Sequence, residues 1–89
     1  MTDCLAPHLP PLVPNWTKLV WIDARNDPRR KTLDWTCHCA EVVYELCAAG
    51  GQTYLRRTDT GTGMIDETHR MSPRAGYATW HALLTGLVR

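Results

Sequence analysis

Residues 33–59 decide the fold of this chain, and they read LDWTCHCAEVVYELCAAGGQTYLRRTD. The stretch holds three of the four cysteines and the clearest periodicity in the sequence. A Gly50-Gly51 pair separates two segments rich in residues that favour strands. The pattern predicts that residues 42–47 and 52–58 form an antiparallel hairpin.

Two periodicities compete in residues 41–49. As a helix that ends at the glycine pair, this segment would gather Val42, Val43 and Leu46 on one side. As a strand, it alternates Val42, Tyr44 and Leu46 with their neighbours, and the sequence Val-Val-Tyr has high sheet propensity. We favour the strand, and the helix stays open as the alternative.

A second strand is predicted immediately before the hairpin. In residues 32–39, apolar and polar side chains alternate over eight positions, which is the pattern of a half-buried strand. The pattern places Cys37 and Cys39 on one face together with Trp35, and it turns His38 to the opposite face. In such a strand the cysteines are ordinary core residues.

Further elements flank this region. Residues 16–25 contain a run of apolar side chains and predict a mostly buried first strand, whereas residues 64–71 predict a charged strand at the sheet edge. Residues 1–15 carry four of the six prolines, which predicts an extended Pro-rich arm. The arm precedes a single domain formed by residues 16–89.

The last predicted element is an amphipathic helix. Ser72 as N-cap and Pro73 at the first helical position are a typical helix start. The residues expected on the face that packs against the sheet are Tyr77, Trp80, His81 and Leu84. The sequence therefore predicts an α+β fold, in which a small antiparallel β-meander of about four to five strands is covered by one C-terminal helix.

The charge composition excludes a strong overall attraction to nucleic acid or to anionic lipid. Ten basic and nine acidic side chains are mixed along the chain, for a formal net charge of +1. Direct nucleic-acid binding would need a local patch, for which the candidates are Arg29, Arg30, Lys31 and Arg56. We interpret these residues as a solvated face of the sheet and expect no direct contact with nucleic acid.

The N-terminal residues do not resemble a signal peptide. No Lys or Arg precedes Lys18, and prolines interrupt the apolar residues. The apolar runs are also shorter than the roughly 18 residues of a membrane span. We expect a cytoplasmic protein without membrane contact, whose cysteines are reduced.

The cysteine cluster allows two interpretations. The donors that could hold zinc are Cys37, His38, Cys39 and Cys47, to which the arm could add Cys4 or His8. A Cys-x-Cys pair on a regular strand suits tetrahedral closure poorly, so we favour core cysteines without a cofactor. The alternative is a zinc-stabilised module with an option of nucleic-acid binding, and an oxidising environment would allow a disulfide from Cys37 or Cys39 to Cys47.

Part of the chain resembles a group of short actinobacterial proteins, the BldB-like proteins, which are often encoded beside helix-turn-helix regulators. The resemblance covers roughly residues 35–88 and rests on the order CAEVVYE, GG, YLRRTD, and then a helix with a tryptophan and a terminal LTG. The counterparts of the group's recurring residues are Cys39, Glu41, Arg57, Asp59 and Trp80. The resemblance implies a regulatory or partner-binding role without enzymatic activity, in a filamentous bacterium.

These observations predict a small interaction protein. No nucleophile motif surrounds the cysteines or histidines, so we expect no enzymatic activity. We expect contact with other proteins, as a homodimer and as the partner of a DNA-binding regulator. The residues expected to bind partners are Trp16, Trp21, Met64 and Met71.

Overall fold

The glycine pair forms the turn of a long hairpin in the computed structural model, which describes residues 6–89. Strands β3 (Val42–Ala49) and β4 (Gln52–Asp59) pair antiparallel along their whole lengths. Gly50 and Gly51 have φ angles of 58° and 80°, a region that glycine enters without steric penalty. The strand interpretation of residues 42–47 is confirmed, and the helix alternative is wrong.

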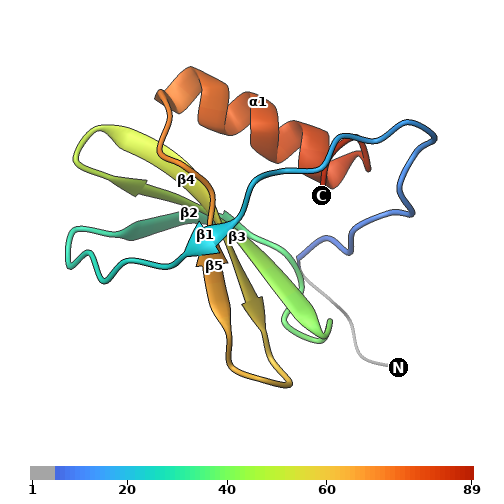
Figure 1. Ribbon diagram of the computed structural model, residues 1–89, viewed down its shortest axis with the longest axis horizontal. Coiled ribbons are helices and arrows are strands. Elements are labelled where there is room, and N and C mark those ends of the chain that lie inside the picture. The colour runs from blue at the N-terminus through green and yellow to red at the C-terminus, as the bar shows by residue number, and fades with distance from the viewer. Residues whose placement is uncertain (1–5) are drawn as a thin grey trace.

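The described residues form five strands and one helix (Figure 1). The other strands are β1 (Ile22–Asp23), β2 (Lys31–Trp35) and β5 (Ile65–Glu67). The sheet order is β1-β5-β4-β3-β2, and every neighbouring pair is antiparallel. Strands β2 to β5 follow one another as a meander, and β1 returns to the free side of β5. The predicted α+β fold with one C-terminal helix is confirmed.

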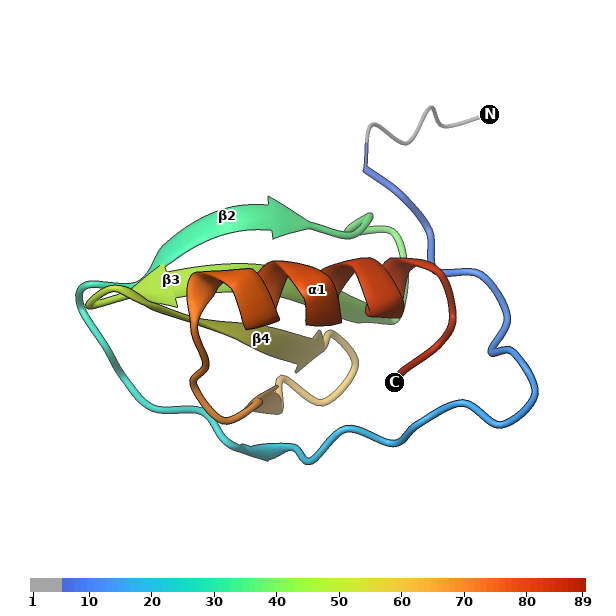
Figure 2. The same ribbon diagram turned by 90° about the horizontal axis from the view of Figure 1, so that it is seen from above.

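Helix α1 (Pro73–Leu84) lies over β3 and β4 on one face of the sheet (Figure 2). Its start is the predicted one, since the Ser72 hydroxyl accepts a hydrogen bond from the Ala75 N–H. The buried positions of the helix are Gly76, Trp80 and Leu83.

The helix face is rotated by about one position from the predicted one. Trp80 is buried as expected, but Tyr77 is 55% exposed and His81 is also exposed. The reason is the close approach of the helix to β4 at Gly76, where a Cβ atom would overlap the Thr53 side chain. Only a glycine fits at this contact, and it turns Tyr77 outward.

The space between helix and sheet is filled by an apolar core. Its buried members are Tyr44, Leu46, Leu55, Trp80 and Leu83. The Trp80 indole N–H, which would otherwise lack a partner in the core, donates to Asp34 Oδ2 on the edge strand β2 at 3.1 Å.

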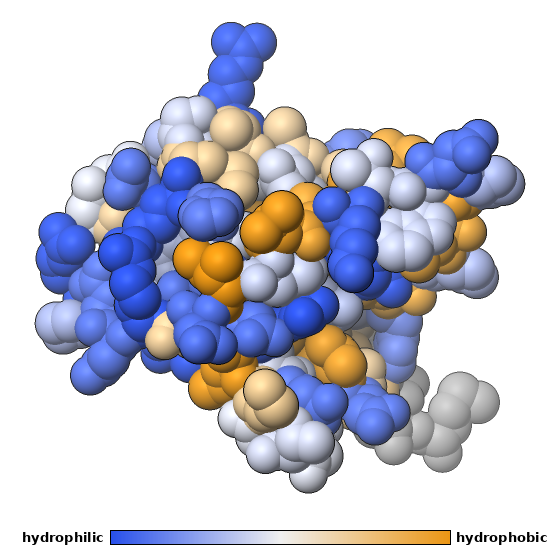
Figure 3. Space-filling view, viewed as in Figure 1, coloured by the Kyte–Doolittle hydropathy of each residue, from blue (hydrophilic) through white to orange (hydrophobic). Residues whose placement is uncertain are grey.

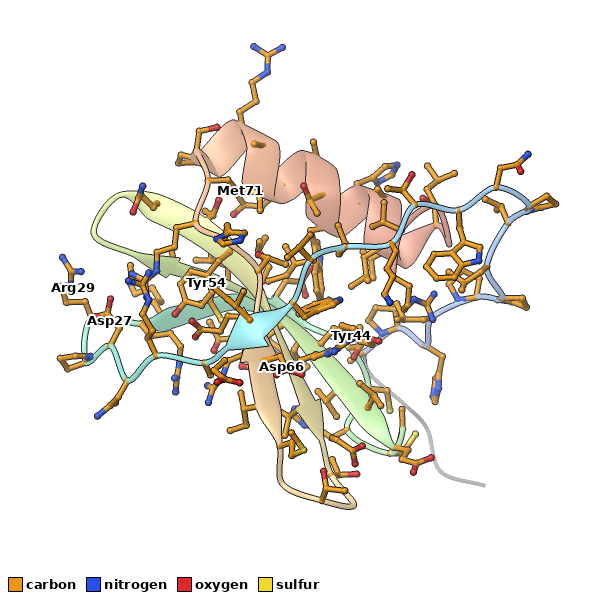
Figure 4. The ribbon with its side chains drawn as sticks, viewed as in Figure 1. Asp27, Arg29, Tyr44, Tyr54, Asp66 and Met71 are labelled. Carbon is orange, nitrogen blue, oxygen red and sulfur yellow. The ribbon has the colours of Figure 1, made fainter. Side chains whose placement is uncertain are left out.

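The opposite face of the sheet has no helix on it, yet Cys47, Ala49 and Tyr54 are buried there. The connection from β1 to β2 passes the Gly50 end of this face, and its Asp27 forms ion pairs with Arg29 and Arg70. Figure 4 shows Asp27 and Arg29 on this connection. The Arg70 guanidinium lies over the Tyr54 ring, 4.6 Å from its centroid. Charged side chains and a loop therefore close this side, and hydrophilic residues dominate the left part of Figure 3.

Two predicted strands differ from the structure. Of residues 16–25, only Ile22 and Asp23 join the sheet, and Val20 is 65% exposed rather than buried. The strand predicted over residues 64–71 is present as the shorter β5, but its predicted edge position is wrong, because β1 covers its free side. The pairing of β1 with β5 joins segments more than 40 residues apart, which no local pattern reveals.

The part of the Pro-rich segment that the structure describes has no regular secondary structure and lies against the domain. Leu9 packs on the core, and the Val13 N–H donates to the Gly86 carbonyl at 3.0 Å. The division between an arm and a domain at residue 15 stays a prediction. Within residues 6–89, no helix is long and apolar enough to cross a membrane.

Candidate functional site

Three side chains with metal-binding donors converge just after β2. A ring nitrogen of His8 and the Sγ atoms of Cys37 and Cys39 all lie within 4.8 Å of one another. The two sulfurs are 3.0 Å apart, and Cys39 Sγ is 3.4 Å from His8 Nε2. Cys37 is buried, whereas Cys39 and His8 are exposed, so the cluster is open to solvent on one side.

A turn holds the two cysteines, not a strand. Strand β2 ends at Trp35. The side chain of the next residue, Thr36, bonds to β3, because its Oγ1 accepts a hydrogen bond from the Tyr44 N–H at 2.9 Å. The Ala40 N–H then donates to the Cys37 carbonyl at 3.3 Å and closes the turn. The predicted regular strand through Cys39 is therefore wrong.

A bulge in β2 also changes the faces. The register shifts at Leu33, so Asp34 lies opposite Leu46 and Trp35 lies opposite Glu45. Leu33 packs against the helix-side core, while Trp35 is exposed on the other face. The predicted alternation, which placed Leu33, Trp35 and the cysteines on one face, is therefore wrong, because the bulge at Leu33 adds one residue to β2.

Two of the four predicted zinc donors do not join this cluster. Cys47 lies on β3 beside Thr32 and Tyr54, about 10 Å further along the strand than Tyr44, which pairs with the turn. A disulfide from the turn to Cys47 is therefore too long. Burial, followed by the charge of Glu45, raises the pKa of the Cys47 thiol to about 11.

The remaining donors have different positions. His38 is exposed between the two cysteines and is not among the converging donors of the described residues. His8 does converge, because the Pro7 carbonyl accepts a hydrogen bond from the Cys37 N–H at 2.9 Å and so fixes the neighbouring His8 at the turn. Cys4 lies outside the described residues.

A groove lies along the segment that leads into β1. Its volume is about 560 Å³, and its lining residues are Trp16, Lys18, Leu19, Val20, Trp21, Arg57 and Arg89. The structure thus brings together the predicted partner-binding residues Trp16 and Trp21. Trp16 is 41% exposed, whereas Trp21 is half-buried and forms the floor of the groove.

Aromatic and cationic groups stack in the floor of the groove. The Arg57 guanidinium lies 4.5 Å from the Trp21 ring centroid, and Trp21 packs against Tyr44 with 5.9 Å between ring centroids. Arg57 is held in place by Asp66 Oδ2 at 3.1 Å. Figure 4 shows Tyr44 and Asp66 close together beside β1. Burial raises the pKa of Tyr44, so this phenol stays neutral.

The backbone of this segment is bonded on one side only. The Thr17 and Leu19 N–H groups donate to the carbonyls of Leu87 and Arg89 at 2.9 and 3.0 Å. The N–H and C=O groups of the intervening Lys18 and of Val20 have no backbone partner among residues 6–89. The apolar side chains of the groove therefore lie next to backbone groups that bond no other backbone among the described residues.

The other predicted partner-binding residues lie elsewhere. Met64 is 63% exposed in the loop before β5, where it borders a hollow with Tyr44, Arg57 and Asp66. Met71 forms a bridge with Thr53 at the start of the helix and is half-buried.

The basic residues considered for nucleic acid do not form an uncompensated patch. Arg29 is paired with Asp27 at 3.1 Å. Arg56 lies on β4 between Glu45 and Glu67 of the neighbouring strands. Arg30 and Lys31 are exposed before and at the start of β2. Half of this cationic set therefore lies beside carboxylates.

Sequence reasoning missed the cations of the groove. Arg89 reaches it because its guanidinium donates to the Pro10 carbonyl at 3.2 Å, across 79 residues of sequence. No local pattern could have predicted this contact.

Comparison of the chain with protein-family models, with curated proteins and with solved structures gave no match.

Proposed function

We propose that this chain is a non-enzymatic cytoplasmic interaction protein that binds partner proteins through the groove along residues 16–21. The observation that carries the proposal is the exposure of Val20 and Trp16 next to an open backbone edge. Its first partner is a second copy of the chain, and a DNA-binding regulator is the further partner.

An open edge of this kind supports binding by strand addition. An extended segment of a partner can bond to the N–H and C=O groups of Lys18 and Val20, which have no backbone partner among residues 6–89, while its side chains enter the adjacent groove. Main-chain bonds then supply affinity, and pockets for alternate side chains supply specificity. Two copies can meet edge to edge in the same way, which forms a closed twofold dimer.

The side chains of the groove support a protein partner of mixed character. Trp16 and Val20 offer apolar area, and aromatic residues are enriched at interface centres. Lys18, Arg57 and Arg89 add positive charge, so a partner segment with both apolar and acidic side chains fits best. The resemblance to BldB-like proteins supports a helix-turn-helix regulator as the source of such a segment.

Sedimentation velocity over a range of micromolar concentrations tests the proposal. We expect a concentration-dependent dimer, which Val20→Lys weakens at least tenfold because it replaces exposed apolar area with a further cation beside Lys18, Arg57 and Arg89. Met64→Lys is the matched control, since Met64 is equally exposed but lies outside this groove. A dimer that Met64→Lys disrupts and Val20→Lys leaves intact would overturn the assignment.

The regulator is tested separately by co-purification with any helix-turn-helix protein whose gene adjoins that of this chain. We expect capture by the wild-type chain and by Met64→Lys, with loss in Val20→Lys. A chain that is monomeric at all concentrations and captures no such protein contradicts the proposed function.

A further inference from the structure

We infer that His8, Cys37 and Cys39 are ligands of a structural zinc ion that fastens the N-terminal segment to the sheet. Two sulfurs and one imidazole nitrogen lie within 4.8 Å of one another, at the end of a β-strand and on a segment 29 residues away. Sulfur and nitrogen donors in tetrahedral sites are typical of zinc.

The separations suit a tetrahedral ion. With Zn–S bonds of about 2.3 Å and Zn–N bonds of about 2.0 Å, a tetrahedron sets sulfur to nitrogen at about 3.5 Å and sulfur to sulfur at about 3.8 Å. Cys39 Sγ and His8 Nε2 are 3.4 Å apart. The two sulfurs, at 3.0 Å, need to separate by less than ~1 Å, which a small side-chain rotation of the exposed Cys39 provides.

The backbone around the cluster is already in place for binding. The turn is fixed by bonds from Tyr44 to Thr36 and from Ala40 to Cys37, and the bond from Cys37 to Pro7 presents His8. A hollow of about 280 Å³ lies beside the donors and includes the buried Thr36 in its lining. Preformed donors reduce the ordering that metal binding requires.

The sequence supplies a fourth donor. Cys4 precedes His8 by four residues, a spacing of Cys-x-x-x-His, and four residues span up to about 13 Å. Sequence separation alone therefore permits Cys4 as the fourth ligand, and three cysteines with one histidine are a set found in structural zinc centres.

Metal content provides the first test. The full chain is purified without added metal under reducing conditions, and zinc is measured by elemental analysis. We expect about one zinc per chain in the wild type and less than about a tenth of that in Cys37→Ser, Cys39→Ser and His8→Asn. The matched controls are Cys47→Ala and His38→Asn, which remove the same residue types outside the cluster and should keep the metal.

Replacement of the metal by cobalt is a second test, and it uses the wild-type chain, so its result does not depend on whether the variants fold. We expect the visible bands of tetrahedral Co²⁺ together with thiolate charge-transfer bands, and a weaker charge-transfer band in Cys4→Ser. Absence of both zinc and cobalt uptake by folded wild-type protein overturns the inference. Metal uptake that is unchanged in Cys37→Ser and Cys39→Ser also overturns it. A third contradicting result is a stable disulfide between these two cysteines, detected by mass spectrometry in cell extracts kept under reducing conditions. Dimerisation is measured independently, so failure of the metal site leaves the proposed function untouched.

Discussion

The two faces of the sheet are closed by different means. On one face, helix α1 covers an apolar core that includes the fully buried Leu46, Leu55 and Leu83. On the other, a loop and ion pairs of Asp27 cover Tyr54 and its neighbours. Apolar burial does not itself titrate with pH, whereas ion pairs depend on both pH and ionic strength. Among residues 6–89 a single helix covers the sheet, so the second face relies on charged side chains.

The largest expected effect comes from the helix side. Leu83→Ala removes a fully buried side chain from the core and should lower the free energy of unfolding by about 3 kcal/mol, because it leaves a cavity. Urea unfolding followed by circular dichroism measures the change. The exposed Leu87→Ala is the control and should cost less than about 0.5 kcal/mol. Equal losses in the two variants would contradict a core on this face.

A close helix–sheet contact gives the next effect. Gly76→Ala brings a methyl group into the Thr53 side chain, so we expect a loss of about 1–3 kcal/mol despite the higher helix propensity of alanine. The exposed Ala78→Gly calibrates propensity at a helical site without this contact and should cost about 1 kcal/mol. A stabilising Gly76→Ala would show that the helix does not approach β4 as described.

The opposite face should respond to pH. Hydrogen bonds from Arg29, and then from Arg70, hold the pKa of Asp27 well below its usual range. A depressed carboxyl pKa stabilises the fold fully above the unfolded value of about 3.9, and this contribution is lost as the pH falls through the folded pKa. We therefore expect the melting temperature of Asp27→Asn to fall less steeply below about pH 4 than that of the wild type.

The measurement is a series of thermal melts between neutral and acid pH, with Asp23→Asn as a control. Asp23 is an exposed carboxylate on β1 with no ion pair among the described residues. Its variant should keep the wild-type acid slope. If Asp27→Asn and the wild type lose stability in parallel, the charged cover contributes little, and the contrast between the faces is smaller than the contacts suggest.

The helix side was also the more predictable one. The Gly50-Gly51 turn, the Val-Val-Tyr strand and the Ser72-Pro73 helix start are local signals, and each led to the correct element. The site was less predictable, because a bulge at Leu33 ended the alternation before Cys37. A sequence pattern can suggest cysteine and histidine donors, but it cannot show which of them a turn will bring together.

Long-range contacts account for the rest. The pairing of β1 with β5 and the bond from Arg89 to Pro10 join distant segments, so periodicity within a window carries no signal for them. The groove along residues 16–21 depends on both contacts. Its tryptophans could therefore be proposed from composition, whereas the position of its cations could not be predicted.

The smallest expected effect concerns Tyr54, on the face of the sheet that the helix does not cover. The Tyr54 hydroxyl is buried without a hydrogen-bond partner among the described residues, although the ring lies under Arg70. An unpaired buried hydroxyl costs free energy, so Tyr54→Phe should change stability by less than about 0.5 kcal/mol or increase it, while the cation–π contact is kept. Tyr54→Leu removes the ring and should lose about 1 kcal/mol or more. Urea unfolding of both variants separates the two contributions, and a large loss in Tyr54→Phe would mean that the hydroxyl is bonded in solution.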